Sequence, residues 1–279
     1  MTNALSVDVE DWFQVGAFEN TISRADWDGL EHRVEANTDA VLALFGESGV
    51  KGTFFTLGWV AKRYPALIRR IADAGHEVAS HGWDHKRVFT LSADAFREDI
   101  DMAKRALEDA SGAQVTGYRA PSFSIDKRTP WAHSVLAEAG YTYSSSVAPI
   151  SHDHYGWPDA PRGAFKPVQG AELIELPVTI AQFLGKEITA GGGFFRLLPG
   201  QVTRNAVRAA NGNERPAVFY FHPWEIDPGQ PRVAGAPLKS RLRHYARLHA
   251  MAGKLKTLID NHQWGRMDTV AAREAEKLA

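Results

Sequence analysis

Short apolar runs recur along the chain, separated by longer stretches whose apolar residues fall at helical spacing. Each run holds five or six residues, and most are rich in β-branched or aromatic side chains, as buried strands are. We predict seven strands, at residues 5–9, 52–57, 77–81, 115–119, 141–145, 173–178 and 217–222.

Helical patterns fill much of the sequence between the predicted strands. The clearest cover residues 34–45, 64–74, 92–110 and 238–262. Ser92 is a suitable N-cap for the third of these helices, and Gly112 is a suitable stop, since glycine adopts the left-handed conformation that ends many helices. The alternation of strand and helix predicts parallel βαβ units, and seven strands in 279 residues favour one closed α/β barrel over two domains.

The chain is expected to form one domain over residues 1–270, because no low-complexity linker divides it. Residues 271–279 are polar, and we predict that they form a frayed tail. The longest irregular stretch, residues 148–172, contains four prolines. A loop of that length is more often functional or mobile than part of the core.

The composition is that of an ordinary globular protein, with 44% hydrophobic and 23% charged residues. A formal net charge of −1 gives no reason to expect a nucleic-acid partner. The absence of cysteine excludes disulfides, thiolate metal ligands and a thiol nucleophile. The N-terminus lacks the basic start and apolar run of a secretory signal, and no stretch approaches the roughly 18 apolar residues of a membrane span, so we expect a cytoplasmic protein.

Four polar residues of catalytic type lie at the carboxyl ends of predicted strands: Asp8, His81, Arg119 and His222. In a (β/α) barrel these ends face one rim, where the chemistry of such barrels is found. Each residue alone has an ordinary explanation, because polar side chains are common where a strand gives way to a loop. Four of them on one rim favour a functional site.

His81 and His85 form an H-x-x-x-H pair. A spacing of four places both imidazoles on one face of a helical turn, where they can bind one metal ion. The pair alone is a weak signal, because chance supplies roughly 0.4 such pairs in a chain with 11 histidines. Two surface histidines in a loop are the alternative.

The first predicted strand ends in three carboxylates, Asp8, Glu10 and Asp11. Such a cluster is either a solvated acidic turn or a metal ligand together with a general base. Two histidines and one carboxylate leave open positions on a divalent ion, which suits Zn²⁺ holding a water molecule. Side chains alternate along a strand, so Asp8 and Glu10 point to the same side. This favours Glu10 as the third ligand, whereas a bend in the chain would bring in Asp11.

Three other features have simpler explanations. The glycines at 191–193 lack the lysine of a phosphate loop and no clear helix follows them, so they predict a flexible loop near a site. Trp83, Trp157 and Trp224 are able to stack on sugar rings, although tryptophan packs in cores more often. The basic face of residues 238–262 is typical of a solvated helix, with contact to an anionic membrane or polymer as the less common alternative.

Together these residues make the sequence resemble the polysaccharide deacetylases, also called carbohydrate esterase family four. The ordered motifs of that family are an aspartate-rich first strand, H-[ST]-x-x-H, R-x-P, a tyrosine segment and a late strand ending in histidine. Here they occur in the same order as residues 6–11, 80–85, 119–121, 141–146 and 220–222. The resemblance covers about residues 5–225. A subgroup associated with exopolysaccharide synthesis is closer still, over residues 7–13, 191–196 and 222–225.

By this resemblance the fold is a distorted (β/α)7 barrel. The protein would be a hydrolase that removes N-acetyl groups from a polysaccharide containing N-acetylhexosamine, its expected partner. The resemblance implies one divalent metal, most simply Zn²⁺, held by His81, His85 and a carboxylate of the first strand. Asp8 would act as general base, with Arg119 fixing its orientation.

The resemblance also assigns roles to residues later in the chain. His222 would protonate the departing amine, because an amide nitrogen leaves poorly without a proton. A backbone N–H near Ser122, which stands at the position of a family tyrosine, would stabilise the oxyanion. Pro121 and Trp224 are the other residues expected to lie against the substrate.

Two departures from the family pattern are visible. Family members often carry adjacent aspartates in the first motif, where this chain has Asp8, Glu10 and Asp11. The fourth motif often supplies an aspartate after the tyrosine, and here that residue is Ser144, so the ion pair of that aspartate is missing or is supplied elsewhere. Two other functions remain open, namely hydrolysis of a small cyclic amide on the same scaffold and sugar binding without catalysis.

Overall fold

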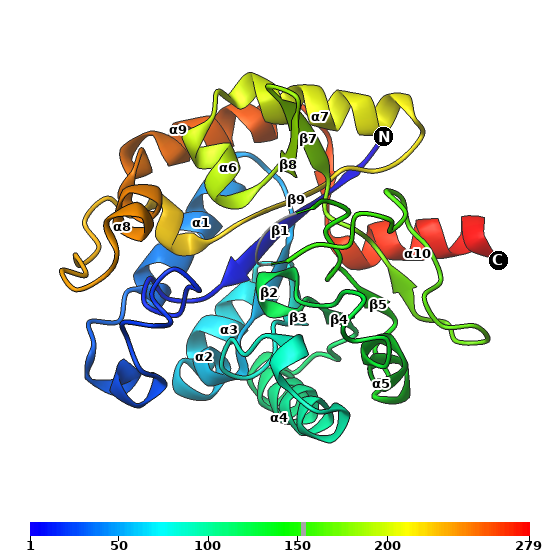
Figure 1. Ribbon diagram of the computed structural model, residues 1–279, viewed down its shortest axis with the longest axis horizontal. Helices are drawn as coiled ribbons and strands as arrows, with labels where there is room; N and C mark the ends of the chain where they lie inside the picture. The colour runs from blue at the N-terminus through cyan, green and yellow to red at the C-terminus, as the bar shows by residue number, and fades with distance from the viewer. Residues whose placement is uncertain (152–154) are drawn as a thin grey trace.

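A computed structural model describes residues 1–151 and 155–279. At its centre, parallel strands form a sheet that curls into a half-barrel, with helices packed around the outside (Figure 1). The strands of this half-barrel are β1 (Asn3–Val9), β2 (Thr53–Thr56), β3 (Glu77–Ser80), β4 (Gly117–Tyr118), β5 (Tyr143–Ser144), β6 (Ile174–Glu175) and β9 (Val218–Phe221). Six of the seven fall within the predicted strands, and β1 begins two residues before the predicted start at residue 5. The predicted single-domain (β/α)7 architecture is confirmed.

β1 is an inner strand of the sheet and pairs in parallel with a strand on each side. Residues 6–9 of β1 pair with β2, and residues 4–7 pair with β9. The two ends of the curl meet after β6, where Thr179 N–H donates to the Val218 carbonyl at 3.1 Å and Val218 N–H donates to Thr179 Oγ1 at 2.8 Å. The barrel is distorted because these bonds, and not a ladder between β6 and β9, join its ends in the described residues.

The α-helices of the described residues surround this sheet. They are α1 (Val34–Glu47), α2 (Gly58–Arg63), α3 (Pro65–Asp73), α4 (Ala93–Ser111), α5 (Ala132–Glu138), α6 (Gly192–Leu197), α7 (Gly200–Gly212), α8 (Leu238–Tyr245), α9 (Leu248–Asp260) and α10 (Met267–Leu278). The predictions at 34–45, 64–74 and 92–110 are confirmed by α1, α3 and α4, and Ser92 caps α4 as expected. The sequence did not predict α2, α5, α7, the short strand β10 (Trp264–Gly265) or the hairpin of β7 (Ile180–Phe183) and β8 (Lys186–Thr189).

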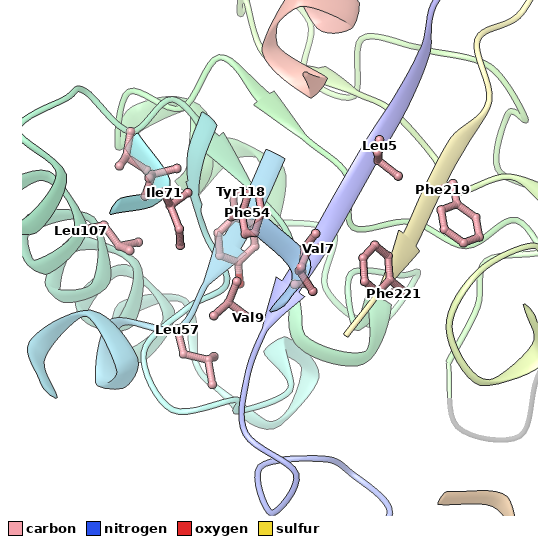
Figure 2. Packing of buried hydrophobic residues seen from close by; sticks show 14 of the residues in the cluster. Leu5, Val7, Val9, Phe54, Leu57, Ile71, Leu107, Tyr118, Phe219 and Phe221 are labelled. Carbon is pink, nitrogen blue, oxygen red and sulfur yellow. The ribbon is translucent and has the colours of Figure 1, made fainter. Parts of the chain in front are cut away.

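Side chains of β1 alternate between two layers. Leu5, Val7 and Val9 are fully buried in one apolar cluster with residues of α1, α3 and α4 (Figure 2). Because successive side chains of a strand point to opposite faces, Asp8 faces the inside of the curl. The register of β1 with β2 and β9 then brings the carboxyl ends of these strands to one rim.

The predicted helix at 238–262 is two helices, α8 and α9, so this prediction is wrong. The chain turns at Arg247, whose φ of 59° is left-handed. The physical reason is Arg196, which donates from Nη2 to the Arg243 carbonyl at 2.8 Å and from Nη1 to the Ala246 carbonyl. A guanidinium that binds the last carbonyls of a helix stabilises the end of the helix at that point. The apolar periodicity of residues 238–262 could not predict this contact, because Arg196 lies outside that segment.

The predicted frayed tail is also wrong, since α10 continues to Leu278 and buries Met267, Val270 and Ala271. Its first turn is held by the barrel. Glu77 Oε2 accepts from Asp268 N–H at 3.0 Å, which satisfies one of the N–H groups that a helix N-terminus leaves unpaired. The apolar stripe of α10 is short and lies in its first half. The polar residues at the end of the chain therefore gave little indication of a helix.

The irregular stretch at 148–172 carries little regular structure, as predicted, and residues 152–154 lie outside the described residues. Its described parts include buried apolar residues, Ala148, Ile150 and Ala160. Phe165 forms an antiparallel bridge with Glu175. In the described part of the chain, no helix is long and apolar enough to cross a bilayer.

Candidate active site

The predicted site residues meet at the carboxyl rim of the half-barrel. Glu10, His81, Arg119 and His222 are each the first residue after a strand, namely β1, β3, β4 and β9. A cleft of about 460 Å³ opens at this rim, and Asp8 lines it together with Glu10, His81 and His222. The dark-blue segment after β1 and the orange helix α8, which both contribute to the lining, lie on the same side of the molecule (Figure 1).

Asp8 and Arg119 form a buried ion pair at the bottom of the site. Arg119 is fully buried, and its Nη1 lies 2.7 Å from Asp8 Oδ1 and 2.7 Å from Ser6 Oγ. The other guanidinium nitrogens donate to the carbonyl and hydroxyl of Ser145, and the group lies 4.2 Å above the ring of Phe55. These contacts hold the guanidinium in one orientation. The pairing predicted for Arg119 and Asp8 is therefore present in the structure.

Glu10, His81 and His85 form the group best suited to a metal ion. Their ligand atoms all lie within 4.8 Å of one another. Glu10 Oε2 is buried, lies 2.9 Å from His85 Nε2, and accepts no hydrogen bond from the described residues. A buried carboxylate oxygen without a donor is costly, so a cation fits this position.

Electrostatics keep both kinds of ligand in the form that binds metal. Burial alone would raise the pKa of Glu10, but the neighbouring His85, His222 and His81 lower it to about 2. Burial lowers the pKa of His81 to about 4, so its imidazole is neutral. His81 Nδ1 donates to the Arg119 carbonyl at 2.8 Å, which leaves Nε2 for a metal.

The two histidines do not share a helical turn, so that part of the prediction is wrong. Gly82 and His85 have φ values of 74° and 60°, and a loop brings the two rings to a centroid distance of 5.5 Å. Gly82 stands where family members carry Ser or Thr. A Cβ there would lie 2.8 Å from Asp99 Oδ2, and the left-handed φ of residue 82 favours glycine over a residue with a side chain.

Asp11 has a different position from Glu10. Its carboxylate accepts backbone N–H bonds from Trp12 at 2.9 Å, Arg33 at 2.8 Å and Val34 at 3.1 Å. The last two fix the start of α1, where an acidic group is favourable. Asp11 is thus not part of the group formed by Glu10, His81 and His85.

His222 is held from behind by Glu225, a residue to which the sequence analysis gave no role. Nδ1 of His222 donates to Glu225 Oε1 at 2.8 Å, and Arg196 Nε donates to Glu225 Oε2 at 2.9 Å. Both Glu225 and Arg196 are buried. Glu225 therefore provides an acidic partner in a chain that has Ser144 in the fourth motif. The available signals were the Glu three residues after His222 and the arginine that follows the glycines at 191–193.

The surroundings of His222 favour its protonated form. Burial acts to lower the pKa of His222, but the carboxylates of Glu10 and Glu225 outweigh it and raise the pKa to about 9. Nε2 of His222 lies 3.6 Å from Glu10 Oε1, which places this nitrogen beside a residue of the proposed metal group. A positioned imidazolium at this place is suited to donate a proton.

Trp224 contacts the site residues themselves. Its indole N–H donates to Glu10 Oε1 at 3.2 Å. Its ring stacks on His244 at a centroid distance of 4.2 Å and on His222 at 5.2 Å. Trp224 still borders the cleft, but these contacts occupy its ring, which favours a positioning role over the predicted contact with a sugar.

Ser122 and Pro121 differ in their access to the cleft. Ser122 lines it, and both Ser122 and Phe123 have left-handed φ values, of 56° and 50°. Strained backbone of this kind is common at functional sites. Pro121 is buried and lies outside the set of described residues that line the cleft.

The glycines at 191–193 form the start of α6, not a loose loop, so the prediction of a flexible loop is wrong. A Cβ on Gly191 would lie 2.4 Å from the Tyr220 carbonyl, and one on Gly192 would lie 2.8 Å from the Tyr220 ring. Glycine is needed here because α6 packs directly on β9. This close packing places Arg196, one turn later, behind Glu225.

Comparison with known families identifies the class of protein. Residues 27–144 match the family model for polysaccharide deacetylase, and residues 145–272 match a domain model of unknown function, DUF3473. Residues 27–144 therefore form a polysaccharide deacetylase domain of the kind found in carbohydrate esterase family four. The resemblance seen in the motifs is confirmed at this level, whereas the exopolysaccharide subgroup stays a prediction.

Among curated relatives, the peptidoglycan-N-acetylglucosamine deacetylase PgdA of Listeria monocytogenes is 33% identical over 91 residues. That match covers 33% of this chain and 20% of the relative. The matches to the curated relatives cover between 20% and 40% of those proteins. The relatives' names support a deacetylase, but only through this shared segment.

Solved structures show the same fold. A Mycobacterium smegmatis protein assigned to the polysaccharide deacetylases superposes on 100% of this chain and 92% of its own, with a TM-score of 0.65 and 22% identity. Puue allantoinase superposes on 96% of this chain and 88% of its own, with a TM-score of 0.61 and 15% identity. The fold alone therefore does not distinguish an N-deacetylase from an allantoinase.

Proposed function

We propose that the protein is a metal-dependent hydrolase that removes N-acetyl groups from N-acetylhexosamine units of a polysaccharide and releases acetate. The observation that carries the proposal is the cluster of Glu10, His81 and His85 beside the Asp8–Arg119 pair in one cleft. The named activity of the Listeria relative supports the same reaction. An exopolysaccharide is the proposed polymer, and the cytoplasm is the proposed compartment.

Glu10, His81 and His85 would hold one divalent metal, with Zn²⁺ as the simplest choice for two imidazoles and one carboxylate. When bound, the metal supplies Lewis acidity that makes water more acidic and polarises the acetamide carbonyl. Trp224 orients Glu10 from one side, and the Arg119 carbonyl orients His81 from the other. These two hydrogen bonds fix the orientation of the Glu10 carboxylate and of the His81 ring.

Asp8 is the proposed general base. It accepts a proton from the attacking water, whose oxygen forms the new bond to the acetyl carbon. Arg119 keeps one carboxylate oxygen engaged at 2.7 Å and so holds the carboxylate in one orientation. The backbone near Ser122 is the proposed donor to the oxyanion, because Ser122 lines the same cleft.

His222 is the proposed general acid. It transfers the proton on Nε2 to the amide nitrogen as the carbon–nitrogen bond breaks, and Glu225 stabilises the imidazolium before transfer. Arg196 fixes Glu225 in turn. The products are acetate and a free amine on the polymer.

Acetate release tests this function and separates it from the open alternatives. The purified protein, loaded with Zn²⁺, is incubated with N-acetylchitopentaose, with hyaluronan oligosaccharides and with allantoin as a cyclic amide. We expect acetate from an N-acetylated oligosaccharide and no turnover of allantoin. Turnover of allantoin alone would favour the cyclic-amide hydrolase, and sugar binding without acetate release would favour a binding protein.

A further inference from the structure

Among the described residues, each carboxylate that lines the cleft already faces a basic side chain. The pairs are Asp8 with Arg119 at 2.7 Å, Glu10 with His85 at 2.9 Å and Glu19 with Arg87 at 2.7 Å. Arg196 also lines the cleft, and its guanidinium binds Glu225 at 2.9 Å. Any further basic side chain in the cleft therefore has no unpaired carboxylate to match it among the lining residues that the structure describes.

Lys239 and Arg243 provide such charge. Both line the cleft from α8, and both are exposed. Their side chains form no ion pair or hydrogen bond with any residue that the structure describes. Since the two residues are four apart on a helix, their side chains lie on one face, where like charges weaken the helix slightly. An anion placed between them would remove that repulsion.

We propose that Lys239 and Arg243 form a subsite for an anionic group of the substrate, a carboxylate or a phosphate close to the acetylated sugar. The inference rests on the proposed deacetylase function and adds the charge of the substrate to it. A net charge of −1 gives the whole protein no general attraction for polyanions, so the preference would arise locally.

The subsite has a fixed connection to the proposed acid. Arg196 donates from Nη2 to the Arg243 carbonyl at 2.8 Å and from Nε to Glu225 at 2.9 Å. Glu225 in turn accepts from His222 at 2.8 Å. One guanidinium therefore joins α8 to the carboxylate behind His222. A substrate held by its anion on α8 would present its acetamide to the site in a constant register.

An anionic lipid surface is the alternative ligand for this helix. Leu238 and Leu242, also on α8, are 68% and 63% exposed, a pattern that basic membrane-binding helices share. The leucines are not among the described residues that line the cleft, whereas Lys239 and Arg243 are. The basic pair is thus placed for a ligand inside the cleft, which favours the substrate.

The test compares neutral and anionic substrates of the wild type and of the double variant Lys239→Gln/Arg243→Gln. The neutral substrate is N-acetylchitopentaose. A hyaluronan oligosaccharide supplies carboxylates, and UDP-N-acetylglucosamine supplies a diphosphate. We expect the wild type to favour one anionic substrate by roughly five- to tenfold in kcat/KM at low salt, as two partly exposed ion pairs allow. Which anionic substrate is favoured identifies the source of the charge.

In the double variant this preference should disappear through a higher KM, while kcat and the rate on N-acetylchitopentaose stay unchanged. High salt should weaken the preference of the wild type in the same way. Arg241→Gln is the matched control, because Arg241 is a partly buried cation of the same helix outside the cleft lining. It should keep the wild-type preference.

The outcomes separate this inference from the proposed function. Acetate from N-acetylchitopentaose without any anionic preference overturns the subsite and leaves the deacetylase standing. If no substrate is turned over, calorimetry decides: salt-sensitive binding of an anionic sugar that the double variant loses supports the subsite, and equal or absent binding overturns it. Loss of anionic-vesicle binding in the double variant, with substrate preference unchanged, also overturns it in favour of the membrane.

Discussion

The indole N–H of Trp224 donates to Glu10 Oε1 at 3.2 Å, so a residue that follows β9 holds the carboxylate that follows β1. The other oxygen, Glu10 Oε2, is buried without a hydrogen-bond partner in the described residues and lies near His85. One oxygen is thus anchored, and the other is available for a cation. This arrangement distinguishes Glu10 from Asp11, whose oxygens are occupied by backbone N–H groups.

Metal content should therefore separate the two carboxylates. Glu10→Ala is expected to lose the metal and the activity, because it removes a ligand. Asp11→Ala should keep the metal but lose about 1–2 kcal/mol in the free energy of unfolding, the usual cost of removing a helix cap. Elemental analysis and urea unfolding of both variants give the answer. A metal-free Asp11→Ala with a fully loaded Glu10→Ala would exchange the two roles.

His81→Ala and His85→Ala should each lose metal and activity while keeping the fold, because both rings belong to the Glu10 group at the rim and lie outside the strand ladders. The readouts are stoichiometric metal by elemental analysis and an unchanged circular dichroism spectrum. Full metal and full activity in either variant would contradict the site.

Asp8→Asn should keep the metal and reduce kcat by roughly 10²–10⁴-fold, the range typical of a lost general base. Asparagine retains the shape of the side chain and one acceptor for Arg119, so binding of substrate should change little. The measurements are steady-state acetate release and metal content. A variant with wild-type kcat would remove Asp8 from the base role.

Glu225→Gln should move the alkaline limb of the kcat profile to lower pH. The carboxylates of Glu10 and Glu225 raise the pKa of His222 against the effect of burial. Loss of the Glu225 charge lowers that pKa, so the protonated acid disappears at lower pH as pH rises. Metal content should not change. Glu98→Gln, on the exposed face of α4, is the control with the same charge loss. An identical shift of the alkaline limb in that variant would falsify the role of Glu225 beside His222.

Glu77 should make the folded protein less stable as pH rises. Burial raises the pKa of Glu77 from 4.5 to about 7. Between these values the unfolded chain releases the proton and the folded chain keeps it, so the free energy of unfolding falls as pH rises from 4.5 to 7. By linkage the loss is on the order of 3 kcal/mol.

Glu77→Gln should remove that pH dependence, because the amide stays neutral. Urea unfolding of metal-free wild type and variant at pH 4.5 and pH 8 measures it, with Glu98→Gln as the exposed control. If the unfolding free energy changes equally between pH 4.5 and pH 8 in wild type and in Glu77→Gln, then Glu77 does not ionise across this range or keeps an ordinary pKa.

The sequence by itself determined the seven strands and the rim position of Asp8, His81, Arg119 and His222. It could do so because a strand is a local pattern, and because residues after parallel strands meet at one edge whatever the details of packing. Strand alternation also placed Glu10 on the side of Asp8, and the structure agrees. The ligand role of Glu10 stays a prediction.

Only the tertiary structure decided how Glu225 and Arg196 support His222. Arg196 and Glu225 are 29 residues apart, and their contact depends on the packing of α6 against β9 through the glycines at 191–193. The same arginine ends α8 by binding its carbonyls, and Glu77 starts α10 by accepting from Asp268. Helix ends and carboxylate partners of this kind are set by side chains from distant segments. The apolar periodicity of a helix therefore cannot predict them.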